Sequence, residues 1–410
     1  MAQTLKFGNG TWATKKGSTL AYNDEGGNFK PLPFTYTGAG KGTRVNKEGL
    51  IEVVENDRPR IDYTDSEDGV FLLEKAATNL FPYSQYYGSG GLVVYAIGTQ
   101  THTITNNYSI SPDGTLNAIR FQATVGGSSS DRVVLRDTLT TTAVDSTVSV
   151  YAKSNTTSNY TLVFHYEGGT RDTFVVTPEW QRFTYSELSN TINNVGVELK
   201  GDVTSLEADV SLYGFQFENN SHASSYIPTQ GTIQTRVQET ASGSGNSEVF
   251  NSEQGVLFAD ISALEDSTNQ RWISVGSGGN ANRVSILFNA TSRIDCSVRG
   301  SSATIYDAFA NIGSQTRVSK AAVKYKNSDF AFFVNGFKVD SQQSGSVSFN
   351  APLSELAFDS ADGNSDFYGK TKEIAYYDEV LTDLELETLT SYRTWEEMVN
   401  ELNLNIIHNE

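Results

Sequence analysis

The stretch Tyr213-Gly-Phe-Gln-Phe-Glu constrains the fold of this chain more than any other. Aromatic residues occupy every second position of it, which is the period of a β-strand with one buried face. The next three residues are Asn, Asn and Ser, which commonly form turns. The segment Ser225-Tyr-Ile-Pro-Thr then contains a proline, which cannot donate a hydrogen bond to a sheet. We therefore expect 213–236 to hold the closing strand of one β-domain and the connection to the next.

Strand character recurs on both sides of this stretch, and the 22 Phe, 20 Tyr and 35 Gly residues favour short strands joined by turns. Eight or so strands in the middle of the chain is a count typical of a jelly-roll sandwich. The middle strands are predicted at Asn117–Thr124, Arg132–Leu135, Ser146–Lys153, Tyr160–Tyr166, Arg171–Val176, Gln181–Tyr185, Gly196–Leu199 and Asp209–Glu218. Later strands are predicted at Val256–Ile261, Arg271–Val275, Arg283–Asn289, Asp295–Arg299, Ser319–Tyr325 and Lys372–Tyr377.

Local motifs near the C-terminus predict a hairpin and two helices. Asn335-Gly336 separates two apolar runs, which predicts a type I′ β-hairpin. The sequences Thr382-Asp-Leu-Glu and Thr394-Trp-Glu-Glu are capping boxes. We expect a short helix after each box, the second one reaching about Asn403. This last helix either docks on the sandwich or associates with its own copies.

Residues 1–78 are the least regular part of the chain. Glycines interrupt short apolar pieces, and the better strand candidates are Gly49-Leu-Ile-Glu-Val-Val and Gly69-Val-Phe-Leu-Leu-Glu. Such a region often needs a partner surface to bury its apolar side chains. We therefore expect a small, irregular β-region that folds onto a partner, and we expect its deletion to leave the later domains folded and soluble.

Charge and composition exclude several classes of protein. A net charge of −18 without a basic patch argues against a nucleic-acid partner. The single cysteine, Cys296, cannot form an internal disulfide, and no Cys/His spacing suggests zinc. The N-terminus lacks the apolar run of a signal peptide, and no 18-residue apolar span is present. We therefore expect synthesis in a cytoplasm and no membrane insertion.

Three groups of motifs, in their order along the chain, resemble those of tailed-bacteriophage virion proteins. The first group resembles their opening module and comprises Thr43-Arg-Val-Asn-Lys-Glu-Gly-Leu-Ile-Glu, Arg58-Pro-Arg-Ile-Asp-Tyr, Phe71-Leu-Leu-Glu and Thr78-Asn-Leu. The second resembles their carbohydrate-binding-module-like jelly rolls and comprises Ser111-Pro-Asp-Gly-Thr, Ser149-Val-Tyr-Ala-Lys, Pro178-Glu-Trp-Gln-Arg-Phe and the two stretches at 213 and 225. The third is similar to concanavalin-like or laminin-G-like lectin sandwiches and comprises Asp329-Phe-Ala-Phe-Phe-Val-Asn-Gly, Tyr368-Gly-Lys-Thr-Lys-Glu-Ile-Ala and Leu381-Thr-Asp-Leu-Glu-Leu.

The resemblance implies an all-β protein with two tandem sandwiches, a jelly roll followed by a concanavalin-like domain. We expect an N-terminal virion-attachment region at 1–78, the jelly roll at 79–232, the lectin-like sandwich at 233–391, and a C-terminal helix and tail at 392–410. The implied protein is a head fibre, tail fibre or decoration protein of the virion, assembled in the bacterial host cytoplasm. Its partners would be capsid, portal or tail proteins bound through 1–78, and its own copies, as a homotrimer first or a dimer second.

Catalytic residues are not evident, and we expect no enzyme activity. The four histidines (His102, His165, His222 and His408) show no catalytic or metal-binding spacing. Glycoside hydrolysis needs two carboxylates flanking the scissile bond. The nearest match, Glu207-Ala-Asp209, lacks a third acid and lies outside the lectin-like domain.

One acidic segment is a candidate for Ca²⁺, either as a structural metal site or as a polar turn. Its oxygen-bearing side chains alternate around a glycine and could wrap a hard cation, but Asp and Asn also make local turn hydrogen bonds. The candidate ligands are Asp359, Asp362, Asn364 and Asp366. We predict no other cofactor.

Aromatic rings that stack on sugars are the expected device for glycan binding, although the same residues commonly pack in cores. The candidates are Trp272, Arg283, Tyr83, Tyr86 and Tyr87. We therefore expect a structural virion appendage that adheres to host-surface glycans. The alternatives are a polysaccharide depolymerase and a spacer or decoration protein without a ligand.

Overall fold

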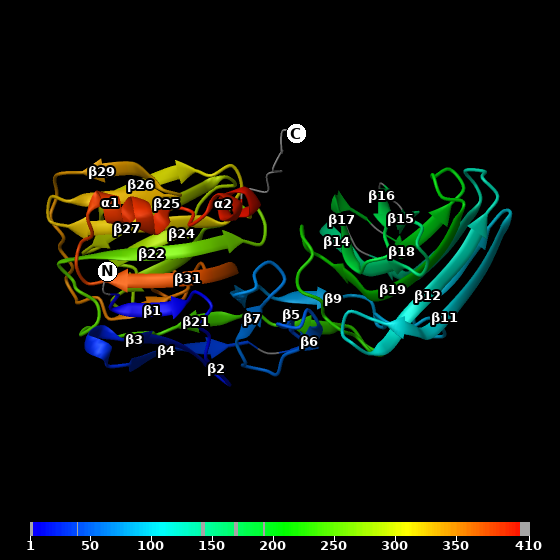
Figure 1. The fold of residues 1–410 in the computed structure, drawn as a ribbon, viewed down its shortest axis with the longest axis horizontal. Helices are drawn as coiled ribbons and strands as arrows, with labels where there is room; N and C mark the ends of the chain where they lie inside the picture. The colour runs from blue at the N-terminus through cyan, green and yellow to red at the C-terminus, as the bar shows by residue number, and fades with distance from the viewer. Residues whose placement is uncertain (1–2, 39, 141–143, 168–170, 192, 402–410) are drawn as a thin grey trace. The chain divides into compact units, whose positions relative to one another are not determined.

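The structure is a computed structural model that describes residues 3–38, 40–140, 144–167, 171–191 and 193–401. The chain forms two compact units, neither of which is continuous in sequence. Unit 1 comprises Met1–Gly38, Asn56–Lys75 and Glu239–Glu410, and unit 2 comprises Ala39–Glu55 and Ala76–Gln238. Strands dominate both units (Figure 1), so the predicted all-β fold with two sandwiches is confirmed.

Unit 1 is a sandwich of a large and a small sheet. The strands of the large sheet are β1 (Leu5–Gly8), β2 (Thr14–Lys15), β3 (Ser18–Asn23), β4 (Lys30–Thr37), β7 (Arg60–Asp62), β8 (Val70–Leu73), β21 (Thr240–Ser242), β22 (Gln254–Ala263), β27 (Ser319–Lys326), β28 (Phe330–Val334), β29 (Phe337–Gln342) and β31 (Gly369–Tyr377). Those of the small sheet are β23 (Arg271–Gly276), β24 (Arg283–Phe288), β25 (Arg293–Gly300), β26 (Ala303–Asn311) and β30 (Glu355–Ala357). The large sheet follows the order β21-β4-β3-β1-β31-β22-β27-β28-β29, with β2 on β3, β8 on β31 and β7 on β8, and the small sheet the order β26-β25-β24-β23-β30. Apolar side chains of both sheets form one continuous core.

Each α-helix of unit 1 begins directly after one of the two predicted capping boxes. A 3₁₀ turn, η1 (Glu25–Gly27), precedes β4, and two α-helices, α1 (Asp383–Thr390) and α2 (Trp395–Glu401), follow the last strand. Thr382 and Glu385 form the predicted reciprocal box of α1. Helix α1 lies on the outer face of the large sheet (Figure 1). Its Leu386 is fully buried there and joins Phe258 and Phe333. None of the described helices is long and apolar enough to span a membrane.

The N-terminal segment completes the large sheet of unit 1. Strand β1 pairs antiparallel with β31, so that Leu5 lies opposite Tyr376 (Figure 1). Phe7, Phe34 and Phe71 are at most 1% exposed within the core. Residues 1–78, which we expected to form one region, are divided between the two units. This division argues against the expectation that their deletion leaves the later domains folded, because 1–38 and 56–75 pack against the rest of unit 1 in the same chain.

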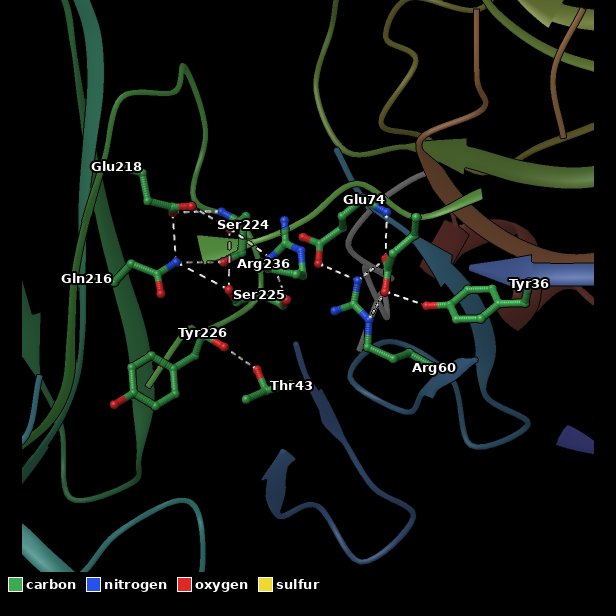
Figure 2. Close-up of polar contacts among 11 residues, drawn as sticks. Tyr36, Thr43, Arg60, Glu74, Gln216, Glu218, Ser224, Ser225, Tyr226 and Arg236 are labelled. Atoms are coloured by element: carbon green, nitrogen blue, oxygen red, sulfur yellow. Dashed lines mark hydrogen bonds and ion pairs between the residues drawn. The ribbon is translucent and has the colours of Figure 1, made fainter. Parts of the chain in front are cut away.

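A buried ion network joins the three sequence segments of unit 1. Arg60 contacts Glu74, with Nη2 2.8 Å from Oε2, and its Nε donates to Oε1 of Glu239 at 2.7 Å (Figure 2). Tyr36 donates to the same Oε1 at 2.6 Å. All four residues are at most 3% exposed. Burial acts to lower the pKa of Arg60, but the charges of Glu239 and Glu74 outweigh it and raise this pKa.

Unit 2 is a sandwich of two five-stranded sheets. One sheet contains β10 (Val93–Ile97), β13 (Arg132–Thr140), β15 (Tyr160–Glu167), β16 (Thr173–Val176) and β18 (Asn193–Lys200). The other contains β11 (Gln100–Ile110), β12 (Leu116–Val125), β14 (Val144–Ser154), β17 (Gln181–Asn190) and β19 (Glu207–Glu218). Their orders are β10-β13-β18-β15-β16 and β11-β12-β19-β14-β17. Two short ribbons pair β5 (Thr43–Val45) with β6 (Ile51–Val53) and β9 (Ala77–Asn79) with β20 (Gln234–Arg236).

The stretch at Tyr213 lies in the last strand, in sequence order, of the two sheets of unit 2, as expected, and this strand is central in its sheet. It belongs to β19, which lies between β12 and β14. The register against β14 shifts at Gly214, which has a φ of 66°, and this β-bulge reverses the side-chain alternation. Phe215 and Phe217 consequently face the core between the sheets, whereas Tyr213 joins a separate cluster with Tyr226. The period-2 pattern had predicted all three aromatic side chains on one face.

The segment after β19 is buried and is held by polar contacts. Tyr226 and Ile227 are at most 2% exposed. The Gln216 side chain accepts from the Ile227 amide at 2.6 Å. It also donates to Glu218 at 2.7 Å (Figure 2). Thr43, which begins the β5–β6 ribbon, donates to the Tyr226 carbonyl at 2.5 Å. This segment and the ribbon together cover the outer side of β19 and β12.

Candidate functional site

A cleft of about 850 Å³ lies in unit 2, where the loop between β9 and β10 meets the segment 228–234. The loop is tied down because the Phe215 amide donates to the Ser84 carbonyl at 2.9 Å and the Gly231 amide donates to the Pro82 carbonyl at 2.9 Å. The cleft is lined by Lys41, Val53, Tyr83, Gln85, Tyr86, Ser89, Asn107, Asn117, Pro228, Thr229, Gln230 and Gln234. Tyr83 and Tyr86, two of the predicted glycan contacts, are thus brought together at one site.

Two tyrosine rings give this cleft an aromatic wall. The ring centroids of Tyr83 and Tyr86 are 5.5 Å apart at an interplanar angle of 49°, and Tyr86 is 42% exposed. Gly88 has a φ of 143°, and a Cβ there would lie 2.7 Å from the Tyr86 hydroxyl. Glycine at this position therefore lets the loop turn closely around the Tyr86 ring. The exposed rings offer apolar faces next to polar groups.

A hydrogen-bond network fixes the two amide side chains of the cleft. Asn117 donates through Nδ2 to Asp113 at 2.9 Å and to Gln85 Oε1 at 3.2 Å. Gln85 in turn donates through Nε2 to the hydroxyls of Tyr226 at 2.8 Å and Tyr213 at 3.2 Å. Because both amide groups donate to defined partners, their orientation is determined. The carbonyl oxygen of Asn117 is consequently left as an acceptor.

Two buried oxygen atoms at the cleft have no partner within the described part of the chain. They are Oδ1 of Asn117 and Oγ1 of Thr229. Thr229 is 5% exposed, and its amide already donates to the Ser84 hydroxyl at 3.0 Å. Buried polar atoms are normally satisfied by protein or ordered water. A ligand that donates a hydrogen bond at Asn117 and exchanges one with Thr229 would satisfy both atoms.

Asp113 is the ionised partner of Asn117 and does not itself line the cleft. Burial acts to raise the pKa of Asp113, but hydrogen bonds from Ser111, Thr115 and Asn117 outweigh it and hold this pKa below the ordinary value of 3.8. Tyr213 donates to the same carboxylate at 3.0 Å. Burial, with Tyr226 and Asp113 adding to it, raises the pKa of Tyr213. Asp113 is therefore charged and Tyr213 neutral near pH 7, and both orient the network rather than exchange protons.

The other predicted glycan contacts do not join this cleft. Tyr87 is half-buried and packs against the core of unit 2. Trp272 and Arg283 lie in unit 1, where each is 7% exposed. The Arg283 guanidinium carbon lies 4.2 Å from the centroid of the Trp272 ring, so this ring face is covered by the arginine. A ring so enclosed has no open face for a sugar.

The acidic segment in unit 1 is organised as a polar turn. Asp359 accepts from the Ala361 amide at 2.6 Å, and Asp362 accepts from the Asn364 amide at 3.2 Å. Asp366 accepts from the Tyr368 hydroxyl at 2.9 Å. Within the described ranges, no group of three or more His, Cys, Asp or Glu side chains is arranged to hold a metal ion. The local contacts account for these carboxylates without a cation.

One member of the Glu207/Asp209 pair, the nearest match to a glycosidase pattern, forms an ion pair with Arg120. Asp209 accepts from Nε of Arg120 at 2.9 Å and from Asn155 at 2.8 Å. The hydrogen bond from Arg120 is the main reason that the pKa of Asp209 is lowered. A general acid needs a raised pKa, so Asp209 is unsuited to protonate a glycosidic oxygen.

The sequence did not identify Gln85, Asn117 or Thr229 as site residues. Gln85 lies between Tyr83 and Tyr86, both of which were predicted as glycan contacts, and this position could have indicated that Gln85 belongs to the same site. Asn117 was placed only in a strand, and its role depends on Asp113 of the Ser111-Pro-Asp-Gly-Thr turn and on the distant Gln85. Thr229 follows Pro228 in the stretch that we treated as a connection.

Comparisons with known proteins give structural likenesses only. No family model matches the chain, and no curated protein matches it. A Ruminococcus gnavus IT-sialidase CBM40 bound to alpha2,3 sialyllactose is similar over 34% of this chain and 83% of its own, at 19% identity and a TM-score of 0.30. The N-terminal CBM22-1-CBM22-2 tandem domain of Paenibacillus barcinonensis Xyn10C covers 75% of this chain and 99% of its own, at 12% identity and a TM-score of 0.27. Mouse laminin alpha1 domains LG4-5 cover 62% of this chain and 87% of their own, at 9% identity and a TM-score of 0.24. Likenesses this weak carry no argument about function, which rests on the geometry of the cleft.

Proposed function

We propose that the protein is a non-catalytic saccharide-binding protein and that the cleft of unit 2 is its binding site. The observation that carries this proposal is the combination of the Tyr83–Tyr86 wall with the unpartnered oxygens of Asn117 and Thr229. Sugars present apolar C–H faces and many hydroxyl donors, so they fit a site with aromatic faces and fixed polar groups.

The proposed binding mode assigns a role to each group. The ring of Tyr86, the more exposed of the two tyrosines, would stack on a pyranose face. Asn117 Oδ1 would accept from a sugar hydroxyl, and Thr229 Oγ1 would donate or accept. Satisfying buried polar atoms that otherwise lack partners favours the bound state, because each unsatisfied atom costs free energy in the unbound protein.

Binding of the full chain to an array of neutral, acidic and amino-sugar polysaccharides tests this proposal. We expect binding to a subset of the array and loss of that binding in Tyr86→Ala. Silence across the array would overturn the proposal and favour a spacer without a ligand. Release of reducing ends from a bound polysaccharide would contradict the non-catalytic assignment and favour a depolymerase.

We further propose that the protein acts on a bacteriophage particle as a fibre or decoration protein that adheres to host-surface glycans. The support is the order of the sequence motifs that resemble tailed-phage virion proteins. The proposed partners are capsid, portal or tail proteins, and the proposed assembly is a homotrimer, with a dimer as the alternative. Antibody labelling of purified particles would test the location, and light scattering would test the assembly; unlabelled particles or a monomer would contradict these proposals.

A further inference from the structure

Two arginines lie side by side on the outer face of the small sheet of unit 1. Arg283 of β24 is the cross-strand partner of Arg299 of β25. Their neighbours Val284 and Val298 face the core and are fully buried, so both arginines project from the opposite face. Like charges directly opposite each other on a sheet are destabilising. A negative charge beside the two arginines would therefore stabilise this pairing.

No carboxylate of the described residues forms an ion pair with either guanidinium. Arg283 Nη1 donates to the Ser360 carbonyl at 2.8 Å, and Arg299 Nη2 donates to the Ser302 carbonyl at 2.9 Å. The Nε atoms of both arginines are buried without a hydrogen-bond partner among the described residues. Only 7% of Arg283 is exposed. A buried charge without an ionic partner lowers the stability of the folded protein.

Asp362, an acid whose charge acts on Arg283, does not neutralise the pair. Its carboxylate accepts from Asn280 at 3.2 Å, from the Asn364 amide at 3.2 Å and from Ser360. Burial lowers the pKa of Arg283, and the charge of Arg299 lowers it further, while Asp362 acts in the opposite direction without overcoming them. The pair thus retains an excess of positive charge in a protein whose net charge is −18.

The surroundings hold Arg283 in a fixed orientation. Its guanidinium lies against the Trp272 ring at 4.2 Å, an arrangement that stabilises the cation and limits rotation of its plane. Arg299 is half-buried and borders solvent. Two neighbouring guanidinium groups suit an anion with two or three oxygens, because guanidinium donors form charge-assisted hydrogen bonds with such anions.

We infer that Arg283 and Arg299 form an anion-binding site that takes a carboxylate, sulfate or phosphate group. This site lies in unit 1 and does not depend on the saccharide cleft of unit 2. The group could be a free inorganic anion or a substituent of an acidic saccharide, and both sources present the same chemistry to the guanidinium groups.

Thermal unfolding of the full chain at constant ionic strength tests this inference. Sulfate, phosphate and glucuronate are each titrated in the millimolar range against chloride, and glucose is the uncharged match for glucuronate. We expect a saturable rise in Tm with the anions and none with glucose. A rise with sulfate and phosphate alone assigns a free inorganic anion, whereas a rise with glucuronate as well assigns an acidic saccharide.

Variants of Arg299 and Arg293 separate this site from a general salt effect. Arg299→Ala should abolish the anion-dependent rise while leaving the Tm in chloride unchanged or higher, because the like-charge contact is gone. Arg293→Ala, on the same strand but ion-paired with Asp295 at 2.8 Å, should keep the rise. If Arg299→Ala does not fold, Arg299→Lys is the alternative, since it keeps the charge but loses the planar donor group. The anion concentration that gives half of the Tm rise should then be at least several-fold higher than in the wild type. Equal rises in wild type and the Arg299 variant, or no rise with any anion, would overturn the inference.

Discussion

Arg60 and Glu239 are 179 residues apart in sequence, yet they form a buried ion pair with Nε 2.7 Å from Oε1. Tyr36 and Glu74 complete the network, so one cluster joins residues 1–38, 56–75 and 239–410 into unit 1. The cluster explains how a sandwich can be built from three separate pieces of chain.

Removing the acidic partner should destabilise unit 1 strongly. We expect Glu239→Gln to lower the free energy of unfolding by about 3–5 kcal/mol, because it leaves Arg60 buried with an incomplete set of counter-charges. Urea denaturation followed by circular dichroism measures this loss. Lys6→Ala is the control, since Lys6 and Asp24 form a half-exposed pair at 2.7 Å that is worth at most about 1 kcal/mol. Similar losses in the two variants would contradict the role of the network.

Two phenylalanines of the N-terminal segment should differ sharply in their effect on stability. Phe7 is 1% exposed in the core of unit 1, whereas Phe29 is 74% exposed. We expect Phe7→Ala to cost about 3–5 kcal/mol of unfolding free energy and Phe29→Ala to change it by less than about 0.5 kcal/mol. Denaturation midpoints of the two variants test whether this segment belongs to the fold. A harmless Phe7→Ala would contradict that assignment.

Thr229→Val should separate ligand binding from stability. The Thr229 hydroxyl is buried without a partner among the described residues, so replacing it with a methyl group should leave the Tm unchanged or raise it. Affinity for a bound saccharide should fall by about 2- to 10-fold, the worth of one hydrogen bond. Ser84→Ala is the comparison, because the Ser84 hydroxyl contacts Tyr226 at 2.6 Å and the Thr229 amide at 3.0 Å and should be needed for stability. Unchanged saccharide affinity in Thr229→Val would remove Thr229 from the site.

The pKa of Asp113 predicts how the stability of unit 2 depends on pH. Because this pKa is lower in the folded protein than its ordinary value of 3.8, the ionised carboxylate stabilises the fold above that value. The contribution is lost as pH falls through the folded pKa. We expect Asp113→Asn to lower the Tm at pH 7 and expect the difference from wild type to shrink below pH 3.8. An equal difference at pH 7 and pH 3 would show that the charge of Asp113 is not the cause.

Local motifs were read correctly where a few neighbouring residues decide the structure. The type I′ turn is confirmed by φ values of 50° at Asn335 and 84° at Gly336. The capping box at Thr382 is complete. At Thr394 the hydroxyl accepts from the Glu397 amide at 2.9 Å, whereas the Glu397 carboxylate turns to the Arg393 amide instead. The expected end of α2 near Asn403 lies outside the described residues.

Features that depend on distant partners could not be read from the sequence. Alternation around Tyr213 predicted a strand but gave neither its central place in the sheet nor the bulge at Gly214. Strand β1 looked irregular because its partner, β31, lies more than 360 residues away. Strand β11 was missed because most of its side chains are polar and exposed. For the site, two of the lining tyrosines were predicted, but the amide network that joins Asn117 and Gln85 was not.

Calorimetric titration of an array-selected saccharide into matched tyrosine variants tests the central claim most directly. Tyr86 lines the cleft and is 42% exposed, whereas Tyr108 of the same unit is 41% exposed, does not line the cleft and lies 4.6 Å from the Arg120 guanidinium. We predict at least a tenfold loss of affinity in Tyr86→Ala and wild-type affinity in Tyr108→Ala. Wild-type affinity in Tyr86→Ala, with or without a loss in Tyr108→Ala, would contradict the cleft as the saccharide site.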